Sequence, residues 1–390
     1  MSDHAKDLTV KPTPRRQKWR SFWLNVHLYL GLSVGLLFVL IGLSGSLLVF
    51  YVEIDELINP VLQISRVPVT APKTYEAIFQ ALRIRHPERT GAWRLEVPRH
   101  AQAPLIARYY KPIETEHLVF APLMASVNPY SAEVTSSRFW GEFLMTWIYD
   151  FHYTLLLDST GKTIMGIGGG FLLLGLGTGL YLWWPAPSKL RMALSIKKAA
   201  SKPRFIFDLH KLNGVYGFVI LALLILSGIL LELPDFFNPG IERLSPLYQS
   251  KNTISMPQSD KSRITLDQAI AFAVEKFPKA TLRWIETPHN EIGSYRIMLY
   301  QHGEPSKRFP KTTLWIDQYS GVILSVRNPA NHSAGDHFLS WLHPLHSGEI
   351  AGLPGRWVVL ISGFMPLILY VTGFMRWRQK RRAKRKLAYQ

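Results

Sequence analysis

The chain has 390 residues and a formal net charge of +18, and 47% of its residues are hydrophobic while only 18% are charged. It contains no cysteine, which excludes disulfides, thiolate-bound iron–sulfur clusters, zinc-thiolate sites and c-type haem attachment. A helix needs about 20 mainly apolar residues to cross a membrane, and several segments of the chain meet that requirement. The composition therefore indicates an integral membrane protein.

The hydropathy pattern predicts a regular order of segments along the chain. We expect, in order, a basic tail (1–21), a first span (22–51), an outer α+β module (52–138), an amphipathic helix (139–163), a second span (164–184), a basic loop (185–208), a third span (209–233), a second outer α+β module (234–335), an amphipathic segment (336–353), a fourth span (354–375) and a basic tail (376–390).

The positive charge lies in alternate loops of this arrangement. Lys and Arg cluster in the two tails and in the loop 185–208, so the positive-inside rule predicts that both termini are cytoplasmic. A nucleic-acid-binding face would not follow that alternation, and we therefore expect no nucleic acid as a partner. Anionic membrane lipid is the expected partner of the basic loops.

Each outer module begins with a predicted helix and continues with short strands. Apolar spacing predicts helices over Tyr75–Arg85 and Leu266–Phe277, the second with Thr265 as its N-cap. Alternating runs predict strands at 93–97, 105–110, 118–127, 282–286, 295–300 and 312–316. Turns at 128–134 and 317–323 follow them.

The two halves of the chain repeat each other. His27, Gly31, Ser44 and Gly45 recur 183 positions later as His210, Gly214, Ser227 and Gly228. A second series recurs at an offset of 194, with His152, Gly161, Thr178 and Gly179 matching His346, Gly355, Thr372 and Gly373. We interpret this pattern as a tandem duplication of a unit of roughly 190 residues.

The repeated histidines predict cofactor ligands. His27 and His210 fall at the cytoplasmic ends of spans one and three, and His152 and His346 at the outer ends of spans two and four. Parallel repeats related by a pseudo-twofold axis would let equivalent histidines face each other. Zinc or di-iron sites would lack ligands, whereas a haem needs one axial imidazole on each face. We therefore predict two b haems, with His343 as an alternative to His346.

Two further residue types follow each of the first two histidines. Gly31 and Gly214 lie one turn away, where the missing side chain would leave room for a flat macrocycle. Asn25 and Asn213 lie near enough to orient an imidazole N–H. No catalytic residue beyond the histidines is identified.

Several motifs resemble those of a known family. They are NVHLYLG around His27, DLHKLNG around His210, LHSG around His346, TGLYLWWP at 178–185, TGFMRW at 372–377 and the DxxSG turn at 317–321. Together they resemble the PepSY-associated transmembrane proteins, often called iron-regulated membrane proteins. This family includes the ferric-siderophore (ferrioxamine) reductases of the bacterial inner membrane.

The resemblance implies a four-helix membrane bundle made of two tandem repeats, each with a periplasmic α+β PepSY-like module, and two bis-histidine b haems. It implies a haem-dependent oxidoreductase that reduces Fe(III) in a siderophore, of hydroxamate type, to Fe(II) on the periplasmic side and so releases iron for uptake. His27 and His210 would hold one haem, and His152 and His346 the other. The first module ends in NPYSAEV (128–134) where the family has the acidic turn.

Other functions remain open from the sequence. The conduit could serve another acceptor, such as a quinone or a periplasmic redox protein, or the chain could be a non-redox PepSY scaffold that assists a transporter. No G-x-G-x-x-G motif for a dinucleotide follows a strand, so the electron donor must be a separate cytoplasmic or membrane component. Aromatic and basic residues of the outer segments could face a chelate: Arg138, Trp140, Trp147 and Trp341.

Overall fold

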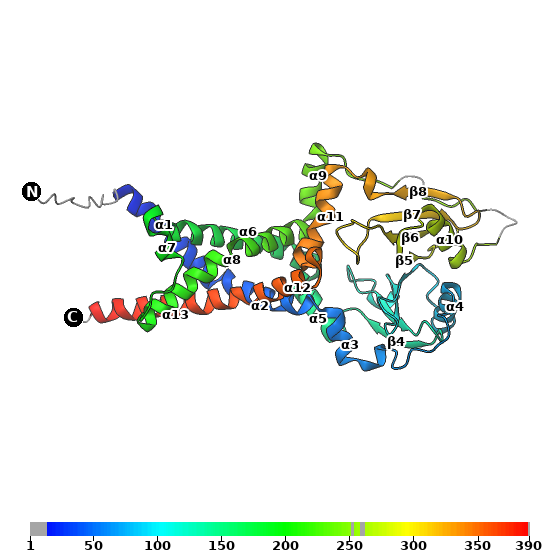
Figure 1. The fold of residues 1–390 in the computed structure, drawn as a ribbon, viewed down its shortest axis with the longest axis horizontal. Helices are drawn as coiled ribbons and strands as arrows, with labels where there is room; N and C mark the ends of the chain where they lie inside the picture. The colour runs from blue at the N-terminus through cyan, green and yellow to red at the C-terminus, as the bar shows by residue number, and fades with distance from the viewer. Residues whose placement is uncertain (1–13, 251–252, 258–261, 389–390) are drawn as a thin grey trace, which may run out of the picture. The chain divides into compact units, whose positions relative to one another are not determined.

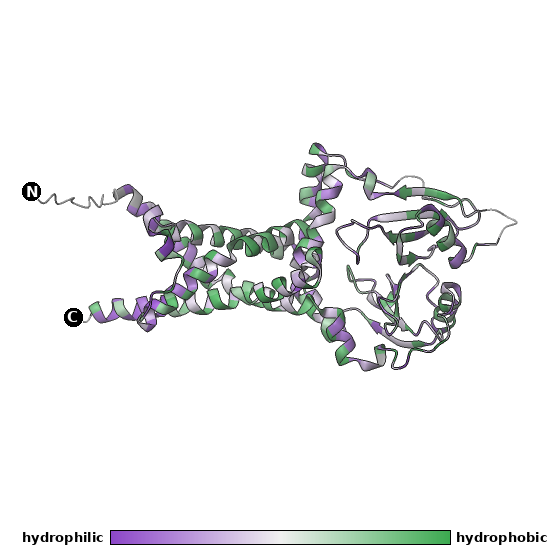
Figure 2. Ribbon diagram, in the orientation of Figure 1, coloured by the Kyte–Doolittle hydropathy of each residue, from purple (hydrophilic) through white to green (hydrophobic). Residues whose placement is uncertain are grey.

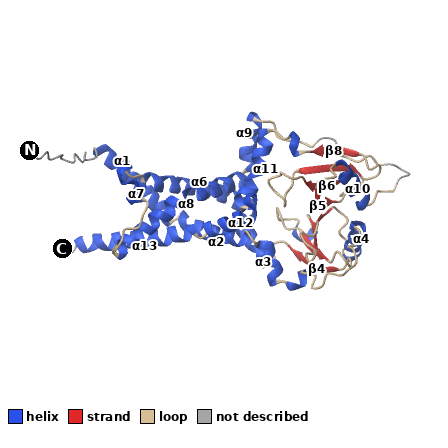
Figure 3. Cartoon of the chain, viewed as in Figure 1, coloured by secondary structure: helices blue, strands red, loops and turns tan. Residues whose placement is uncertain are grey.

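The computed structural model describes residues 14–250, 253–257 and 262–388. The chain divides into two compact units (Figure 1). The first is helical and comprises the residues up to Leu43, Ile167–Leu226, and the residues from Ile361 on. The second comprises Ser44–Gly166 and Ser227–Leu360 and holds every strand of the described residues (Figure 3).

Long apolar helices dominate the helical part of the chain, and Figure 2 shows apolar residues along most of their length. Those long and apolar enough to cross a membrane are α6 (Asp158–Trp183), α8 (Lys202–Glu232) and Glu349–Ala388, which joins η5 (Glu349–Ala351), α12 (Gly352–Ser362) and α13 (Met365–Ala388). A bent pair, α1 (Pro14–Leu32) and α2 (Val34–Leu48), also passes the test as one unit. The described residues thus supply three candidate spans, or four if the bent pair is a single span.

The predicted first span, 22–51, is not one straight helix. It breaks between α1 and α2, which meet at 49°. Ser33 lies at the break, and its hydroxyl donates to the carbonyl of Tyr29 at 2.7 Å. Serine hydroxyls that bond back to a carbonyl one turn earlier often bend helices.

Two basic segments that we expected to be non-helical are partly helical. α8 already begins at Lys202, inside the predicted loop 185–208, and α13 continues to Ala388, through most of the predicted tail 376–390. Lys and Arg are good helix formers, so a membrane-spanning helix can extend beyond its apolar segment into neighbouring basic residues. Within the loop, η3 (Pro187–Lys189) and α7 (Leu190–Ala193) are the only other helical turns described.

The second unit contains one eight-stranded antiparallel sheet in the order β4-β3-β2-β1-β5-β6-β7-β8. Its strands are β1 (Trp93–Glu96), β2 (Leu105–Tyr109), β3 (Leu123–Val127), β4 (Val134–Phe139), β5 (Thr281–Glu286), β6 (Ser294–Tyr300), β7 (Thr312–Asp317) and β8 (Ile323–Arg327). β4 and β8 were not predicted, because no strand was expected after the turns at 128–134 and 317–323.

The two predicted modules are therefore halves of a single sheet rather than separate bodies. β1 pairs with β5, and Leu95 lies opposite Ile285. Both residues are fully buried in a core that draws on both halves. Pairing covers one edge of each half, and an uncovered sheet edge would expose a row of unpaired backbone groups.

Two helices cover this core, α4 (Tyr75–Arg85) and α10 (Leu266–Lys276), and both match the predicted helices closely. Thr265 caps α10 in a full capping box with Gln268, as its position predicted. The helices also cap each other: Asp267 accepts the backbone N–H of Glu76 at 3.0 Å, and Glu76 accepts that of Leu266 at 2.8 Å. These reciprocal bonds satisfy backbone donors that a helix start leaves without partners.

The two turns that differ in sequence have the same local structure. Asp317 accepts the backbone N–H groups of Tyr319 and Ser320 at 2.9 and 2.8 Å. Asn128 accepts that of Tyr130 at 2.9 Å. An Asn carbonyl thus replaces the carboxylate in an Asx-turn, so NPYSAEV at 128–134 performs the role of the acidic turn.

Short helices lie between the sheet and the long helices: α3 (Tyr51–Ile58), η1 (Pro60–Leu62), α5 (Leu144–Thr154), α9 (Pro234–Leu244), η4 (Pro329–Asn331) and α11 (Ala334–Ser347). A further short helix, η2 (Ile113–Thr115), lies between β2 and β3. The predicted amphipathic helix 139–163 is shorter than expected, because β4 takes its first residue and α6 its last turn. The predicted segment 336–353 is mostly α11.

Candidate functional site

The rings of His27 on α1 and His210 on α8 lie 6.2 Å apart between their centroids. His27 Nδ1 lies 3.0 Å from the carbonyl of Gly175 and 3.2 Å from Thr178 Oγ1. A carbonyl oxygen only accepts, so Nδ1 carries the proton and the Nε2 lone pair is available to a metal ion.

His210 repeats this arrangement on the other side of the pair. Its Nδ1 lies 3.0 Å from the carbonyl of Leu369 and 3.0 Å from Thr372 Oγ1. A glycine also lies against each ring: a β-carbon on Gly179 would come 3.0 Å from His27 Cε1, and one on Gly373 would come 3.3 Å from His210 Cε1. The carbonyl contact therefore fixes the tautomer of each of these two imidazoles. The neighbouring glycine leaves room for the ring.

His152 on α5 and His346 on α11 form a second pair with the same separation of 6.2 Å. Ser44 Oγ lies 3.1 Å from His152 Nδ1, and Ser227 Oγ lies 3.0 Å from His346 Nδ1. Both serines are buried. Here too a glycine lies against each ring. A β-carbon on Gly45 would lie 2.8 Å from His152 Cε1, and one on Gly228 would lie 3.2 Å from His346 Cε1.

The geometry of both pairs fits a metal ion between the two rings. An imidazole nitrogen binds a metal at about 2.0–2.1 Å, and the ring centre lies roughly 1.1 Å further back, so two trans ligands have centres about 6.2 Å apart. Among the described residues, no group of three or more His, Asp or Glu side chains could hold a metal ion. The remaining ligands would have to come from a cofactor, as in a haem.

The space beside the first pair also fits a flat ring. A β-carbon on Gly31 would meet nothing within 4 Å, and one on Gly214 would meet only Leu369 Cδ2 at 3.6 Å. These are the two glycines for which the sequence predicted open space. The residues present therefore fit a haem.

The predicted orienting role of the asparagines is wrong. Asn213 donates to the carbonyl of Met365 at 2.9 Å, and Asn25 is exposed. Thr178, Thr372, Ser44 and Ser227 contact the imidazoles instead. The internal repeat already marked these residues. Each of them directly precedes a glycine, and each such pair recurs after 183 or 194 residues, as the histidines do.

His343, the alternative ligand, lies outside both pairs. Its ring packs edge-on against Phe309 with centroids 4.9 Å apart. Burial lowers the pKa of His343 to about 3, and nearby Arg308 acts in the same direction. Its buried Nδ1 has no hydrogen-bond partner in the described part of the chain. His346, not His343, is therefore the partner of His152.

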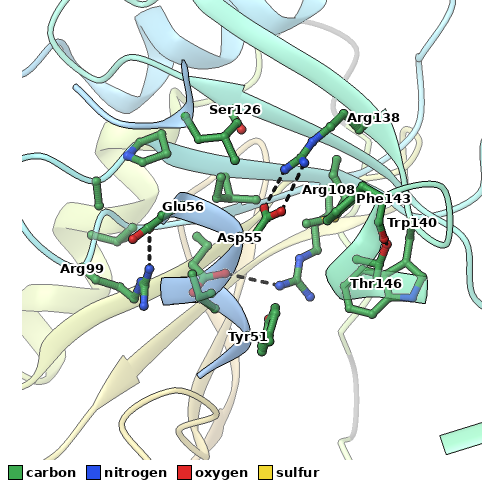
Figure 4. Close-up of a pocket in the computed structure, with 18 residues that line it drawn as sticks. Tyr51, Asp55, Glu56, Arg99, Arg108, Ser126, Arg138, Trp140, Phe143 and Thr146 are labelled. Atoms are coloured by element: carbon green, nitrogen blue, oxygen red, sulfur yellow. Dashed lines mark hydrogen bonds and ion pairs between the residues drawn. The ribbon is translucent and has the colours of Figure 1, made fainter. Parts of the chain in front are cut away.

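A hollow of about 700 Å³, open to solvent, lies in the first half of the sheet unit (Figure 4). Arg138 forms a two-pronged ion pair with Asp55 at 2.8 and 3.3 Å, and Arg99 pairs with Glu56 at 2.6 Å. Trp140 also lines it, so two of the four residues predicted to face a chelate meet here. Trp147 and Trp341 are exposed and do not line this hollow.

The fold and the histidine pairs define a helical membrane-type protein with a separate antiparallel sheet domain and two candidate cofactor seats. The PepSY_TM family, described as the PepSY-associated TM region, matches residues 24–380. The chain therefore belongs to that family, as its motifs led us to expect. A comparison with curated proteins gave no match.

Proposed function

We propose that the protein is a di-haem electron-transfer protein of the bacterial inner membrane that reduces Fe(III) in a siderophore. The observation that carries the proposal is the repeated seat: two histidine pairs, each with ring centroids 6.2 Å apart. In each ring, Nδ1 is engaged by the chain, which is how metal-binding histidines usually hold their second ring nitrogen. A purely structural role of the histidines would not require the same ring separation and the same Nδ1 contacts at two places in the chain.

The architecture that we propose is a four-span bundle of two tandem repeats with both termini in the cytoplasm. The equivalent contacts of Thr178 and Thr372, and of Ser44 and Ser227, support the repeat. The basic segments at both ends and between α6 and α8 support the orientation. His27 and His210 then belong to the cytoplasmic side, and His152 and His346 to the periplasmic side.

One helix links the two seats in sequence. α8 carries both His210 and Ser227, and their 17-residue separation corresponds to about 26 Å along an α-helix. The hydrocarbon core of a bilayer is about 30 Å thick. With one electron carrier near each end of the span, electron transfer across the membrane would proceed in shorter steps than a single site would allow.

The chain's own residues would hold and tune two b haems, which when bound supply one-electron carriers. His27 with His210 would hold one haem, and His152 with His346 would hold the other. The threonine and serine hydroxyls that contact Nδ1 would help to hold the four imidazoles in position. The haems would pass electrons on to a separate acceptor.

We propose a ferric hydroxamate siderophore as this acceptor and the hollow of Figure 4 as its docking place. Arg99, Arg108 and Arg138 line the hollow beside Trp140 and Phe143, each paired with a carboxylate (Glu56, Glu96 and Asp55), so a bound chelate would share their N–H groups with these partners. Donors of this kind suit the oxygen atoms of a metal hydroxamate. Reduction to Fe(II) weakens the hold of those oxygens and releases the metal. The donor would be a separate cytoplasmic or membrane component.

Absorption spectra of the detergent-purified protein test the proposal. We expect two six-coordinate b haems per chain in a pyridine haemochrome assay, and loss of one haem from each of the variants His27→Ala, His210→Ala, His152→Ala and His346→Ala. His343→Ala is the matched control and should keep both. Reoxidation of the reduced protein by a ferric hydroxamate identifies the substrate, whereas reoxidation only by a quinone or redox protein would change the acceptor. A haem-free protein of normal stability would instead indicate a PepSY scaffold.

A further inference from the structure

Two polar side chains near the His152–His346 pair have no role in the proposed site: His343, three residues before His346 on α11, and Arg308, which is close enough to His343 to lower its pKa. The buried Nδ1 of His343 has no hydrogen-bond partner among the described residues. Arg308 forms no ion pair with a carboxylate in the same part of the chain, and its guanidinium donates to the hydroxyl of Tyr51. Buried polar groups are nearly always paired, so the unmatched Nδ1 of His343 points to a missing partner, and a guanidinium without a carboxylate partner lies close to it.

Ring contacts connect Arg308 to His152. Its guanidinium lies over the ring of Tyr51 at 4.4 Å from the centroid. Tyr51 contacts Tyr149 with ring centroids 5.9 Å apart. Tyr149 precedes His152 by three residues on α5, and residues three apart share a helix face. Arg308 is therefore connected, through Tyr51 and Tyr149, to the helix that carries His152.

A parallel set of contacts connects Arg308 to His346. The guanidinium lies 5.1 Å from the ring centroid of Phe309, and Phe309 packs on His343 at 4.9 Å. His343 precedes His346 by three residues on α11. His343 thus lies one turn from His346, and Phe309 lies between His343 and Arg308.

The nearest carboxylate does not neutralise this cation. Glu349 accepts the hydroxyl of Ser306 at 2.8 Å and the backbone N–H groups of Lys307 and Arg308 at 2.8 and 3.1 Å. Burial lowers the pKa of Arg308 to about 10, Glu349 opposes that shift, and Arg356 adds to it. The guanidinium remains charged at neutral pH, and a desolvated charge needs a counter-ion.

We propose that Arg308 and His343 bind a carboxylate of the group held between His152 and His346, namely a propionate of that haem. The guanidinium and an imidazole N–H would both donate to the carboxylate oxygens. The inference rests on the proposed function and goes beyond it, because it assigns two residues outside the axial set. His343 then acts as a positioning residue and not as an iron ligand.

The test compares Arg308→Gln with wild type in a spectroscopic redox titration. Both haems should remain, but the haem that His152→Ala removes should become harder to reduce, because its carboxylate loses a compensating cation. We expect the ratio of reduced to oxidised haem at a fixed potential to fall about tenfold, equivalent to about 59 mV for a one-electron couple. The other haem should not change and is the internal control.

Two further variants and an isotope label on the haem make the test more specific. Arg308→Lys should restore most of the potential, and Arg327→Gln, whose arginine is already paired with Asp336 at 3.2 Å, should leave it unchanged. With haem labelled by ¹³C in its propionates, the infrared difference bands of the carboxylate should shift in Arg308→Gln and in His343→Phe.

Each contrary result has a distinct meaning. Two haems with potentials and propionate bands unaffected by Arg308→Gln would overturn this inference and leave the proposed function intact. A wild-type potential that depends on added citrate, lost in Arg308→Gln, would assign the site to a soluble carboxylate and overturn the propionate assignment. A wild-type protein without haem would overturn both proposals.

Discussion

Gly45 lies directly against the imidazole of His152: a β-carbon at position 45 would come 2.8 Å from His152 Cε1 and 3.4 Å from Nδ1. The preceding residue, Ser44, contacts the same Nδ1 at 3.1 Å. Two consecutive residues of α2 therefore contact one histidine ring, Ser44 at Nδ1 and Gly45 at Cε1. The glycine is required by the close approach of the ring rather than by backbone conformation.

Gly45→Ala should therefore displace His152. The added methyl group cannot be accommodated at 2.8 Å without moving the ring, and metal sites tolerate little misplacement of a ligand. We expect loss of one of the two haems, measured by the haemochrome count. Gly170→Ala on α6 is the control, because a β-carbon there would meet nothing within 4 Å. Two haems with unchanged spectra in Gly45→Ala would contradict the assigned seat.

Thr372→Val tests the hydrogen bond to His210. The variant keeps the shape of the side chain but removes the oxygen that lies 3.0 Å from Nδ1, and only the carbonyl of Leu369 remains. Loss of such a partner usually weakens metal binding by about 10–100-fold. Because one acceptor persists, we expect about a tenfold faster loss of the haem at this site, together with a higher reduction potential.

Thr372→Ser is the matched control, since it retains the hydroxyl and should behave like wild type. Both rates can be followed by transfer of haem to apomyoglobin. Equal rates in the valine and serine variants would show that the hydroxyl does not support the ligand.

The local patterns of the sequence predicted the local structure well. Tyr75–Arg85 is a helix with the expected bounds, because its apolar spacing and its Thr74 cap need no distant partner. The histidine pairs were predictable as partners because the duplication repeats each His at a constant offset. His346 was preferred over His343 for the same reason.

Features that depend on distant neighbours could not be predicted. The join of β1 to β5 pairs Leu95 with Ile285, and no local pattern specifies which two edges meet. Asn213 was close to His210 in sequence, yet on a helix an offset of three residues does not place its amide at the ring's Nδ1, and a neighbouring helix supplies Thr372 instead. Ser33 resembles any other small residue until its hydroxyl is seen to bond Tyr29.

The reciprocal caps of α4 and α10 should stabilise the sheet unit jointly. Asp267 accepts the backbone N–H groups of Tyr75 and Glu76, while Glu76 accepts that of Leu266. Each carboxylate also lies at a helix N-terminus, where negative charge is favourable. Asp267→Ala and Glu76→Ala should each lower the free energy of unfolding by about 1–2 kcal/mol.

A double-mutant cycle distinguishes coupled from independent caps. Because both carboxylates act at one contact between the helices, the double variant should lose less than the sum of the two single variants. Glu275→Ala, on an exposed position of α10, should change stability little. Strict additivity would indicate that each cap acts alone.

Asp150 should make stability depend on pH in a direction opposite to that of most carboxylates. Burial raises the pKa of Asp150 to about 6, although Trp140 Nε1 donates to it at 2.8 Å and opposes the shift, while Asp158 adds to it. Its ordinary value is 3.8. Because the folded state holds the proton more tightly than the unfolded state, this group's contribution to stability is fully present below about pH 4 and is lost as the pH rises through about 6.

Asp150→Asn should therefore be more stable than wild type at pH 8 and equal to it near pH 4, because the amide keeps the acceptor for Trp140 and never ionises. The full shift corresponds to about 3 kcal/mol, but solvent screens this half-buried group, so we expect a gain of about 1 kcal/mol. Thermal unfolding of both proteins between pH 4 and pH 8 measures the difference, with Asp235→Asn as an exposed control. A difference that stays constant across this range would mean that Asp150 does not titrate there.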